Sequence, residues 1–336
     1  MIDFEELPDL ASERLGGAVL AANDEFFAPK EALLKPTPAE WRQDAYTERG
    51  KWMDGWETGR RRTEGYDWCI LRLGAPGVVR GIVVDTAFFR GNYPAECSVE
   101  GCVVPGTPSP DQLADPATEW FEILPKSALQ GDAKNRFPVD SAHRATHLRL
   151  NIFPDGGVAR LRVHGHVAPE WTRFARAGGE VDVAALENGG WVVSCSDMFF
   201  GHRQNLILPG RSLFMGDGWE TKRRRGPGHD WSIVRLAAAS TLHRVEIDTD
   251  HFKGNAPDRF ALEGIHLPGA TADALAHPDA PWTPVLGETR LQPHTRHRFE
   301  DGLMSAGPFT HVRLSIFPDG GIARMRVFGT LPGELP

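Results

Sequence analysis

The stretch Thr146-His-Leu-Arg-Leu-Asn-Ile-Phe-Pro-Asp-Gly-Gly157 recurs nearly unchanged as Thr310-His-Val-Arg-Leu-Ser-Ile-Phe-Pro-Asp-Gly-Gly321. In both copies apolar and polar residues alternate before the Phe-Pro-Asp-Gly-Gly segment, and a period of two is typical of a half-buried strand. A second alternating run, Ala159-Arg-Leu-Arg-Val-His164, follows in the first copy. Because Asp-Gly supplies the positive φ angles of a tight turn, the pattern predicts a β-hairpin.

Alternation also predicts which side chains of this hairpin face the core, because successive residues of a strand point to opposite faces. The apolar residues expected to face the core are Leu148, Leu150, Leu161 and Val163. The residues expected on the other face are His147, Arg149, Arg160 and Arg162.

The repetition extends over nearly the whole chain. Near the start of each copy the offset is 173 residues, as between Asp24-Glu-Phe-Phe27 and Asp197-Met-Phe-Phe200. Between Asp54 and Gly101 the offset is 163, so the first copy carries ten extra residues (173 − 163 = 10) before Asp54, which we expect to form a surface loop around Lys35-Pro-Thr-Pro38. The repeats predict two homologous domains, residues 1–168 and 182–336, joined by a linker at residues 169–181.

Short strands separated by turns dominate each copy. Trp68-Cys-Ile-Leu-Arg-Leu73 and Val79-Arg-Gly-Ile-Val-Val-Asp85 are predicted strands, whereas convincing helical periodicity is scarce. This pattern favours an all-β chain of two tandem jelly-roll β-sandwich domains. The order Asp-Gly-x-x-Thr, Trp-x-Ile-x-x-Leu and a strand ending in Asp resembles the galactose-binding or discoidin-like jelly roll.

Composition and charge narrow the class of partner. The chain of 336 residues has a net charge of −8, which disfavours binding to nucleic acid or to an anionic membrane surface and favours a small ligand. The start of the sequence lacks the basic and apolar regions of a secretory signal, and no stretch approaches the roughly 18 apolar residues of a membrane span. The four cysteines lack CxxC spacing, so we expect reduced, mostly buried thiols in a cytoplasmic protein.

A charged motif occurs once in each copy. Met53-Asp-Gly-Trp-Glu-Thr-Gly-Arg-Arg-Arg62 is followed by Gly65-Tyr-Asp-Trp68, and Gly216-Asp-Gly-Trp-Glu-Thr-Lys-Arg-Arg-Arg225 is followed by Gly228-His-Asp-Trp231. The acids could simply neutralise the arginines in a buried salt-bridge lattice while the tryptophans pack the core. We favour a reaction site, because desolvating so much charge for stability alone is unfavourable.

This double motif, with Phe88-Phe89, Gly91-Asn92 and the segment from Phe153 to Arg160, resembles the allantoicase family. The resemblance covers both copies almost end to end. It implies two jelly rolls, a role in purine breakdown, assembly into homo-oligomers and hydrolysis of allantoate to ureidoglycolate and urea. Allantoate carries one carboxylate and two ureido groups on one carbon, so its site needs a cation and polar partners for the ureido edges. Arginine suits the carboxylate, because its planar fork binds in bidentate fashion.

Expelling urea requires one group that protonates the departing nitrogen and one that activates water, and a carboxyl group of raised pKa can do either. The first catalytic candidates are Glu57 and Glu220, with Asp54 and Asp217 as alternatives. His229, which replaces Tyr66, is a further candidate acid or base. The candidate substrate-binding residues are Arg60, Arg62, Arg223, Arg225, Asp67, Asp230, Asn92 and Asn255.

Three consecutive arginines would alternate sides if the segment were a strand. Arg60 and Arg62 would then share a face while Arg61 points away, and at least one arginine in each copy would be structural. No cofactor or metal site is predicted, since His164-x-His166 and His294-x-x-His297 occur in only one copy each.

Two other functions remain open, a tandem carbohydrate- or small-ligand-binding module and an interaction protein that has lost turnover. Differences between the copies also leave open whether one or both of them turn over substrate, or whether a site lies between them. His229 and His251, for example, replace Tyr66 and Phe88.

Overall fold

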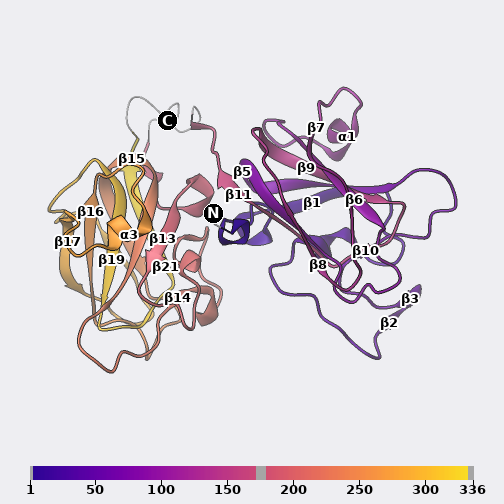
Figure 1. Cartoon of the computed structure of the whole chain (residues 1–336). Helices are drawn as coiled ribbons and strands as arrows, with labels where there is room; N and C mark the ends of the chain where they lie inside the picture. Colours follow the sequence, from indigo (N-terminus) through magenta and orange to yellow (C-terminus); the bar gives the residue numbers. More distant parts are fainter. Residues whose placement is uncertain (1–2, 172–178, 332–336) are drawn as a thin grey trace. The chain divides into compact units, whose positions relative to one another are not determined.

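A computed structural model describes residues 3–171 and 179–331 of the chain. The chain divides into two compact units after Pro169, and Figure 1 shows strands throughout both of them. Most of the segment Arg173 to Gly179, which the sequence places in a linker, lies outside the described residues.

The first unit contains eleven strands, one short α-helix and three 3₁₀ turns. The strands are β1 (Ala18–Ala22), β2 (Tyr46–Thr47), β3 (Gly50–Lys51), β4 (Trp56–Glu57), β5 (Asp67–Asp85), β6 (Glu96–Cys102), β7 (Phe121–Ala128), β8 (Lys134–Pro138), β9 (Arg144–Phe153), β10 (Gly157–Val158) and β11 (Arg160–Val167). The helical elements are η1 (Phe4–Glu6), η2 (Glu13–Leu15), η3 (Lys30–Leu34) and α1 (Pro110–Ala114).

The second unit repeats most of these elements. Its strands are β12 (Val181–Asp182), β13 (Trp191–Cys195), β14 (Trp219–Glu220), β15 (Asp230–Asp248), β16 (Arg259–Ile265), β17 (Thr283–Arg290), β18 (Arg296–Phe299), β19 (Phe309–Phe317), β20 (Gly321–Ile322) and β21 (Arg324–Thr330). Its helical elements are η4 (Leu186–Asn188), η5 (Arg203–Ile207), η6 (Met215–Asp217) and α3 (Ala272–Ala276).

One long strand organises each unit. The 19-residue strand β5 pairs through its first half with β1 and β9, and through its second half with β8 and β11. The pairing with β9 shifts register between Arg72 and Gly77, where the sequence reads Gly74-Ala-Pro-Gly77 and the strand lacks bulky β-branched residues. Residues 68–73 and 79–85, predicted as separate strands, therefore belong to one irregular strand that serves two layers. The prediction of an all-β fold with two tandem jelly rolls is confirmed.

The predicted hairpin between residues 146 and 164 is wrong. Strand β9 pairs with β5 and β6, and β11 pairs with β5, but β9 and β11 do not pair with each other. The Phe-Pro-Asp-Gly-Gly segment instead carries the chain from one half of β5 to the other. On the way, Gly157 and Val158 pair with the motif strand β4.

The core side of these strands was predicted correctly, since Leu148, Leu150, Leu161 and Val163 are all 0% exposed. The other side is less open than alternation suggests, because His147 and Arg160 are also buried. The peptide oxygens of Thr37 and Pro38 accept hydrogen bonds from Arg160, so the polypeptide segment above this side chain covers it.

Helix α1 and its flanking loop cover the outer face of the sheet part that contains β5, β9 and β6. Ile70 and Cys102 pack with Leu113 of helix α1, and Trp68 and Trp120 pack against that cluster. The second unit repeats the arrangement around Ile233, Ile265 and Leu275. A short helix and its flanking loop thus turn a face that alternation marks as solvent-exposed into a second apolar layer.

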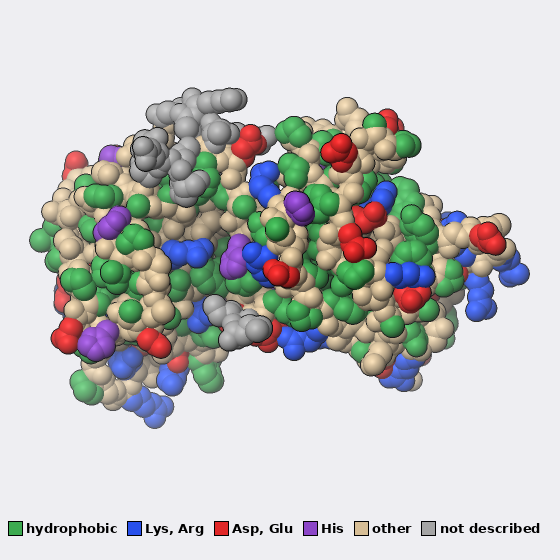
Figure 2. All heavy atoms as spheres, turned by 45° about the horizontal axis from the view of Figure 1, so that its top comes forward, with side chains coloured by type: hydrophobic (Ala, Val, Ile, Leu, Met, Phe, Trp, Pro, Cys, Tyr) green, Lys and Arg blue, Asp and Glu red, His purple; other side chains and the backbone are tan. Residues whose placement is uncertain are grey.

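The ten-residue insertion lies on the surface as predicted, because residues 36–49 are mostly exposed, and the small β2–β3 ladder closes this segment. All four cysteines are free thiols, and three of them are buried. Among residues 3–171 and 179–331, no helix has the length and apolar character needed to cross a membrane. Figure 2 shows acidic and basic side chains interspersed over the visible face rather than gathered into one large patch of a single sign.

Candidate functional site

The charged motif is fixed to the sandwich by backbone and side-chain hydrogen bonds. The indole Nε1 of Trp56 donates to the Asp24 carbonyl oxygen at 2.8 Å, and the Asp24 carboxylate accepts from Gly59 N at 2.7 Å. Thr58 exchanges hydrogen bonds with Gly156 in the Phe-Pro-Asp-Gly-Gly segment. The motif and that segment, nearly 100 residues apart in the sequence, are therefore neighbours in space.

The same anchors recur in the second unit. Trp219 Nε1 donates to the Asp197 carbonyl oxygen at 2.9 Å, and Thr221 exchanges hydrogen bonds with Gly320. The backbone N of Arg224 donates to the Asp319 carboxylate at 2.8 Å. Asp319 thus fixes the arginine segment.

A cleft of about 680 Å³ opens beside the motif of the second unit. Glu220, Arg223 and Arg224 line it together with Asn255 and Asp319. The cleft also has an apolar part, which includes Phe200, Pro257, Leu291 and Pro318. Charged, amide and apolar groups thus converge on a space large enough for a small ligand.

At this cleft a glutamate is held by an amide. Asn255 Nδ2 donates to Glu220 Oε1, and Glu220 is only 8% exposed. In the first unit Asn92 Nδ2 donates to Glu57 Oε1 at 2.6 Å, and Glu57 is also 8% exposed. Burial raises the pKa of the Glu57 carboxyl, against the opposing effect of the Asn92 hydrogen bond.

The arginine segments are loops, so the alternation expected for a strand does not apply to them. Residues 58–66 and 221–229 lie outside the strands that flank them. The middle arginine of each triplet nevertheless has a structural partner: Arg61 Nη1 lies 2.5 Å from Asp67 Oδ1, and Arg224 pairs with Asp230. Asp67 and Asp230 are buried, so these pairs neutralise charge beneath the motif.

The outer arginines of the triplets are exposed: Arg60, Arg62, Arg223 and Arg225. Of the second-unit pair, Arg223 lines the cleft and Arg225 does not. An exposed guanidinium at a cleft wall is free to bind an arriving carboxylate.

Asp54 and Asp217, the alternative catalytic candidates, lie in buried ion pairs. Asp54 Oδ2 is 2.5 Å from Arg160 Nη2, and Asp217 Oδ2 is 2.9 Å from Arg324 Nη2. Neither arginine is more than 4% exposed. This geometry favours a stabilising role for the two aspartates, since each balances a buried guanidinium.

His229 does not line the cleft. Its ring lies against Phe317, with centroids 4.7 Å apart, as Tyr66 lies against Phe153 in the first unit. Burial, with Arg313 and Arg224 nearby, lowers the pKa of His229. The structure therefore favours a packing role for this residue.

Four of the six acidic candidates thus have an arginine partner, whereas no ion pair reaches Glu57 or Glu220 among the described residues. A buried carboxyl group without a cationic partner keeps the freedom to take up and release a proton. The residues that sequence reasoning missed are Thr58 and Thr221, although their recurrence inside the motif was a usable signal.

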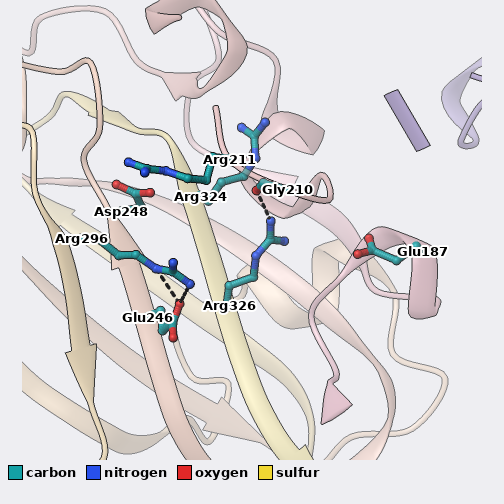
Figure 3. Close-up of a pocket in the computed structure, with 8 residues that line it drawn as sticks. All are labelled: Glu187, Gly210, Arg211, Glu246, Asp248, Arg296, Arg324 and Arg326. Atoms are coloured by element: carbon teal, nitrogen blue, oxygen red, sulfur yellow. Dashed lines mark hydrogen bonds and ion pairs between the residues drawn. The ribbon is translucent and has the colours of Figure 1, made fainter. Parts of the chain in front are cut away.

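A second pocket, of about 240 Å³, lies on another part of the second unit and is drawn in Figure 3. Arg296 pairs there with Glu246, and Arg326 donates to the Gly210 carbonyl oxygen at 2.7 Å. Because most of its charged groups already have partners, this pocket is better described as a charge lattice than as a ligand site.

Comparison with known proteins finds the same duplication that the structure shows. A family model described as the allantoicase repeat matches residues 8–168 and again residues 181–332. The chain belongs to the allantoicase family.

Similarity to individual allantoicases extends over nearly the full length. A Burkholderia mallei protein described as "Probable allantoicase 1" is 49% identical over 323 residues, covering 96% of this chain and 94% of the relative. A "Probable allantoicase" of Photobacterium profundum is 45% identical and covers 98% of both chains. The crystal structure of allantoicase from Saccharomyces cerevisiae matches with a TM-score of 0.80 at 33% identity, covering 97% of this chain and 93% of that one. The allantoicase fold is therefore shared across both units.

Proposed function

We propose that this protein is an allantoicase, which hydrolyses allantoate to ureidoglycolate and urea in purine breakdown. Membership of the family over both units supports the activity. The observation that carries the site is the hydrogen bond between Asn255 and the buried Glu220, beside Arg223 in one cleft.

In this proposal Arg223 binds the substrate carboxylate. Its guanidinium is exposed at the cleft wall, whereas that of Arg224 is held by Asp230. The fork of an arginine matches a carboxylate in geometry and charge, which fixes the central carbon relative to Glu220.

In the proposed reaction, Glu220 acts as the general acid or base. Hydrolysis breaks the bond between the central carbon and one ureido nitrogen; the oxygen of water bonds to that carbon, and the departing nitrogen gains a proton. A carboxyl group that is largely removed from water and is not neutralised by an arginine can deliver or accept this proton. Asn255 holds the Glu220 carboxylate from one side, so the other oxygen is left for the reacting groups.

The first unit offers the same arrangement through Glu57, Asn92 and Arg60. We propose that Glu57 serves as its proton-handling group, because burial raises the pKa of this carboxyl. Arg62 and Arg225, which are exposed next to the motif, would guide the anionic substrate toward each site.

The test is urea release from allantoate by the purified full-length chain, with ureidoglycolate measured as the second product. Equal amounts of the two products are expected. A folded protein that releases no urea would contradict the activity.

Phe200, which is 61% exposed and lines the cleft, favours carbohydrate binding as the second candidate function. Exposed aromatic rings are typical of sugar-binding sites. Calorimetric titration with galactose distinguishes the two: heat of binding without turnover of allantoate would favour the binding module.

We further propose that the protein acts in the cytoplasm as a homo-oligomer on a small molecule, without a nucleic-acid or membrane partner, and that residues 169–181 link the two domains. Light scattering on the purified chain tests the assembly, and a monomer mass would contradict it.

A further inference from the structure

Three side chains able to bind a metal meet at one turn of the second unit. One potential ligand atom from each of Asp250, His251 and His294 lies within 4.8 Å of the other two. Asp250 and His251 lie two and three residues after the end of strand β15 at Asp248, while His294 belongs to the segment between β17 and β18. The side chains of Asp250, His251 and His294 are 12%, 30% and 48% exposed, so solvent reaches the cluster.

The first unit builds the same turn without these side chains. Phe88 and Asp132 have φ angles of 70° and 52°, against 70° and 51° for His251 and His294. The backbone N of Phe88 donates to Asp132 Oδ1 at 2.8 Å, and the backbone N of His251 donates to His294 Nδ1 at 2.8 Å. Folding of the turn therefore does not require two histidines.

The third position differs as well, because Ala87 stands where the second unit has Asp250. Three positions that meet in space have thus become an Asp-His-His set in one copy. None of the three residues takes part in the hydrogen bond between Asn255 and Glu220. The cluster joins His294 to His251 rather than to His297, so it differs from the His294-x-x-His297 pattern of the sequence.

The contacts inside the cluster bring two potential ligand atoms to hydrogen-bond distance. His251 N donates to both His294 Nδ1 and Asp250 Oδ1, and these two atoms lie 2.9 Å apart. Two lone pairs at this distance repel each other unless a proton or a cation lies between them.

We propose that Asp250, His251 and His294 bind one divalent transition-metal ion of the kind that prefers imidazole nitrogen, such as Zn²⁺ or Co²⁺. Two imidazoles and one carboxylate are a common donor set for these ions, and metal–ligand distances of about 2.0–2.2 Å require only small rotations from the present spacing. Partial exposure leaves room for water as a further ligand.

The Arg211 guanidinium would compete with this ion for the Asp250 carboxylate. Its Nη2 lies 2.6 Å from Asp250 Oδ2, and its side chain is 69% exposed, so it can move into solvent when a cation binds the carboxylate. Figure 3 shows that the Arg211 side chain also extends past Asp248. His251 Nε2 lies 3.0 Å from the Ser212 carbonyl oxygen, and metal binding would replace that hydrogen bond.

A bound ion would connect two segments that form walls of the Glu220 cleft. Gly254 and Asn255 follow His251 closely in the sequence, and Leu291 and Pro293 precede His294. The ion would therefore fix the distance between the Asn255 loop and the opposite wall. This role is positional and does not depend on the proposed reaction.

Metal binding by the tag-free full chain tests the site. After treatment with a chelator, the protein is titrated with Zn²⁺ by calorimetry and with Co²⁺ by visible absorption. One ion per chain is expected. The triple variant D250A/H251F/H294D, which restores the residues of the first copy, is expected to lose it while keeping the circular dichroism spectrum.

The exposed His266→Asn is the matched control and should bind like the parent protein. Absence of binding in the parent, or unchanged stoichiometry in the triple variant, would overturn the proposal. Because binding rather than turnover is measured, failure of the allantoate assay leaves this result unaffected.

The variant Arg211→Ala provides an independent test of the proposed metal site. Removing the guanidinium frees the Asp250 carboxylate, so Zn²⁺ affinity should rise by about tenfold or more, the scale of one lost charge-assisted hydrogen bond. Unchanged or weaker affinity would show that Asp250 is not a ligand and would contradict the site.

Discussion

At the residue scale, the glutamates of the two motifs differ from the aspartates of the same motifs. The aspartates at positions 54, 67, 217 and 230 each have an arginine partner, while Glu57 and Glu220 receive a hydrogen bond from an asparagine amide. An amide orients a carboxylate without fixing its charge, whereas a guanidinium stabilises the ionised form. This difference supports our proposal that the glutamates transfer protons and the aspartates stabilise the fold.

Glu220→Gln should lower turnover of allantoate by at least about a hundredfold, the usual scale for loss of a general acid or base. The amide keeps the shape of the side chain but cannot exchange a proton. Urea release under saturating substrate measures the effect. The exposed Glu288→Gln is the control and should retain the parent rate.

Glu57→Gln, measured in parallel, shows which unit turns over substrate. Loss in only one of the two variants assigns turnover to that unit, and near-normal rates in both would move the catalytic role to another residue.

Asp217→Ala should lower the free energy of unfolding by about 3–5 kcal/mol, because it leaves the buried Arg324 guanidinium without its carboxylate. Chemical denaturation followed by tryptophan fluorescence measures the loss. The fraction of protein that remains folded should turn over allantoate at the parent rate. A stable but inactive variant would return Asp217 to the list of catalytic candidates.

At the scale of elements, strand faces were predictable and strand partners were not. Alternation placed Leu148 and Leu161 in the core correctly, because burial depends on which side of a strand a residue occupies. The false hairpin came from two adjacent runs that share β5 as partner, and adjacency in sequence does not reveal a shared third strand. Burial of His147 was missed because alternation places this residue on the outer face of β9 and does not show what covers that face.

Gly321→Ala should destabilise the second unit by about 1–3 kcal/mol, the usual cost of overpacking. An added Cβ would lie 1.9 Å from the ring of the buried Phe252, which cannot move without disturbing the core. A lower thermal midpoint of unfolding is the expected result. Gly226→Ala, with no heavy atom within 4 Å of the added Cβ, should leave that midpoint unchanged, and equal shifts in both variants would contradict the packing argument.

At the scale of the whole molecule, each unit buries one histidine at the same place in its sheet. Burial, with Arg72 nearby, lowers the pKa of His147 to about 4, and burial, with Arg235 nearby, lowers that of His311 to about 4. The unfolded chain therefore binds more protons than the folded one between about pH 4 and pH 6.5.

The free energy of unfolding should accordingly fall as the pH drops from about 6.5 to 4, by roughly 2–3 kcal/mol for each of the two histidines. Urea denaturation at a series of pH values measures this slope. The double variant H147N/H311N should show a clearly flatter slope over the same window. An unchanged slope would mean that other groups carry the acid sensitivity, and the exposed His243→Asn serves as control.

The sequence identified only part of the candidate site, because it does not show which charged residues pair with each other. Duplication marked Glu57, Asn92 and their counterparts, but the same signal marked Asp54, whose partner Arg160 is 106 residues away. Whether an acid is neutralised depends on such long-range pairs. Sequence spacing therefore identified the set of charged groups, and only the fold shows which of them have an ion-pair partner.

The long strand β5 also has a consequence for how the chain reaches its native state. The first half of β5 pairs with β9 and its second half pairs with β8 and β11, so Asp85 lies opposite Lys134 and Arg160, which are both far along the sequence. A topology of such high contact order folds slowly, on the order of milliseconds to seconds or longer, because long loops must close before pairing stabilises them. During synthesis the first unit can complete its central strand only after Val167 has emerged from the ribosome, and until then the edges of β5 are open to pairing with other chains.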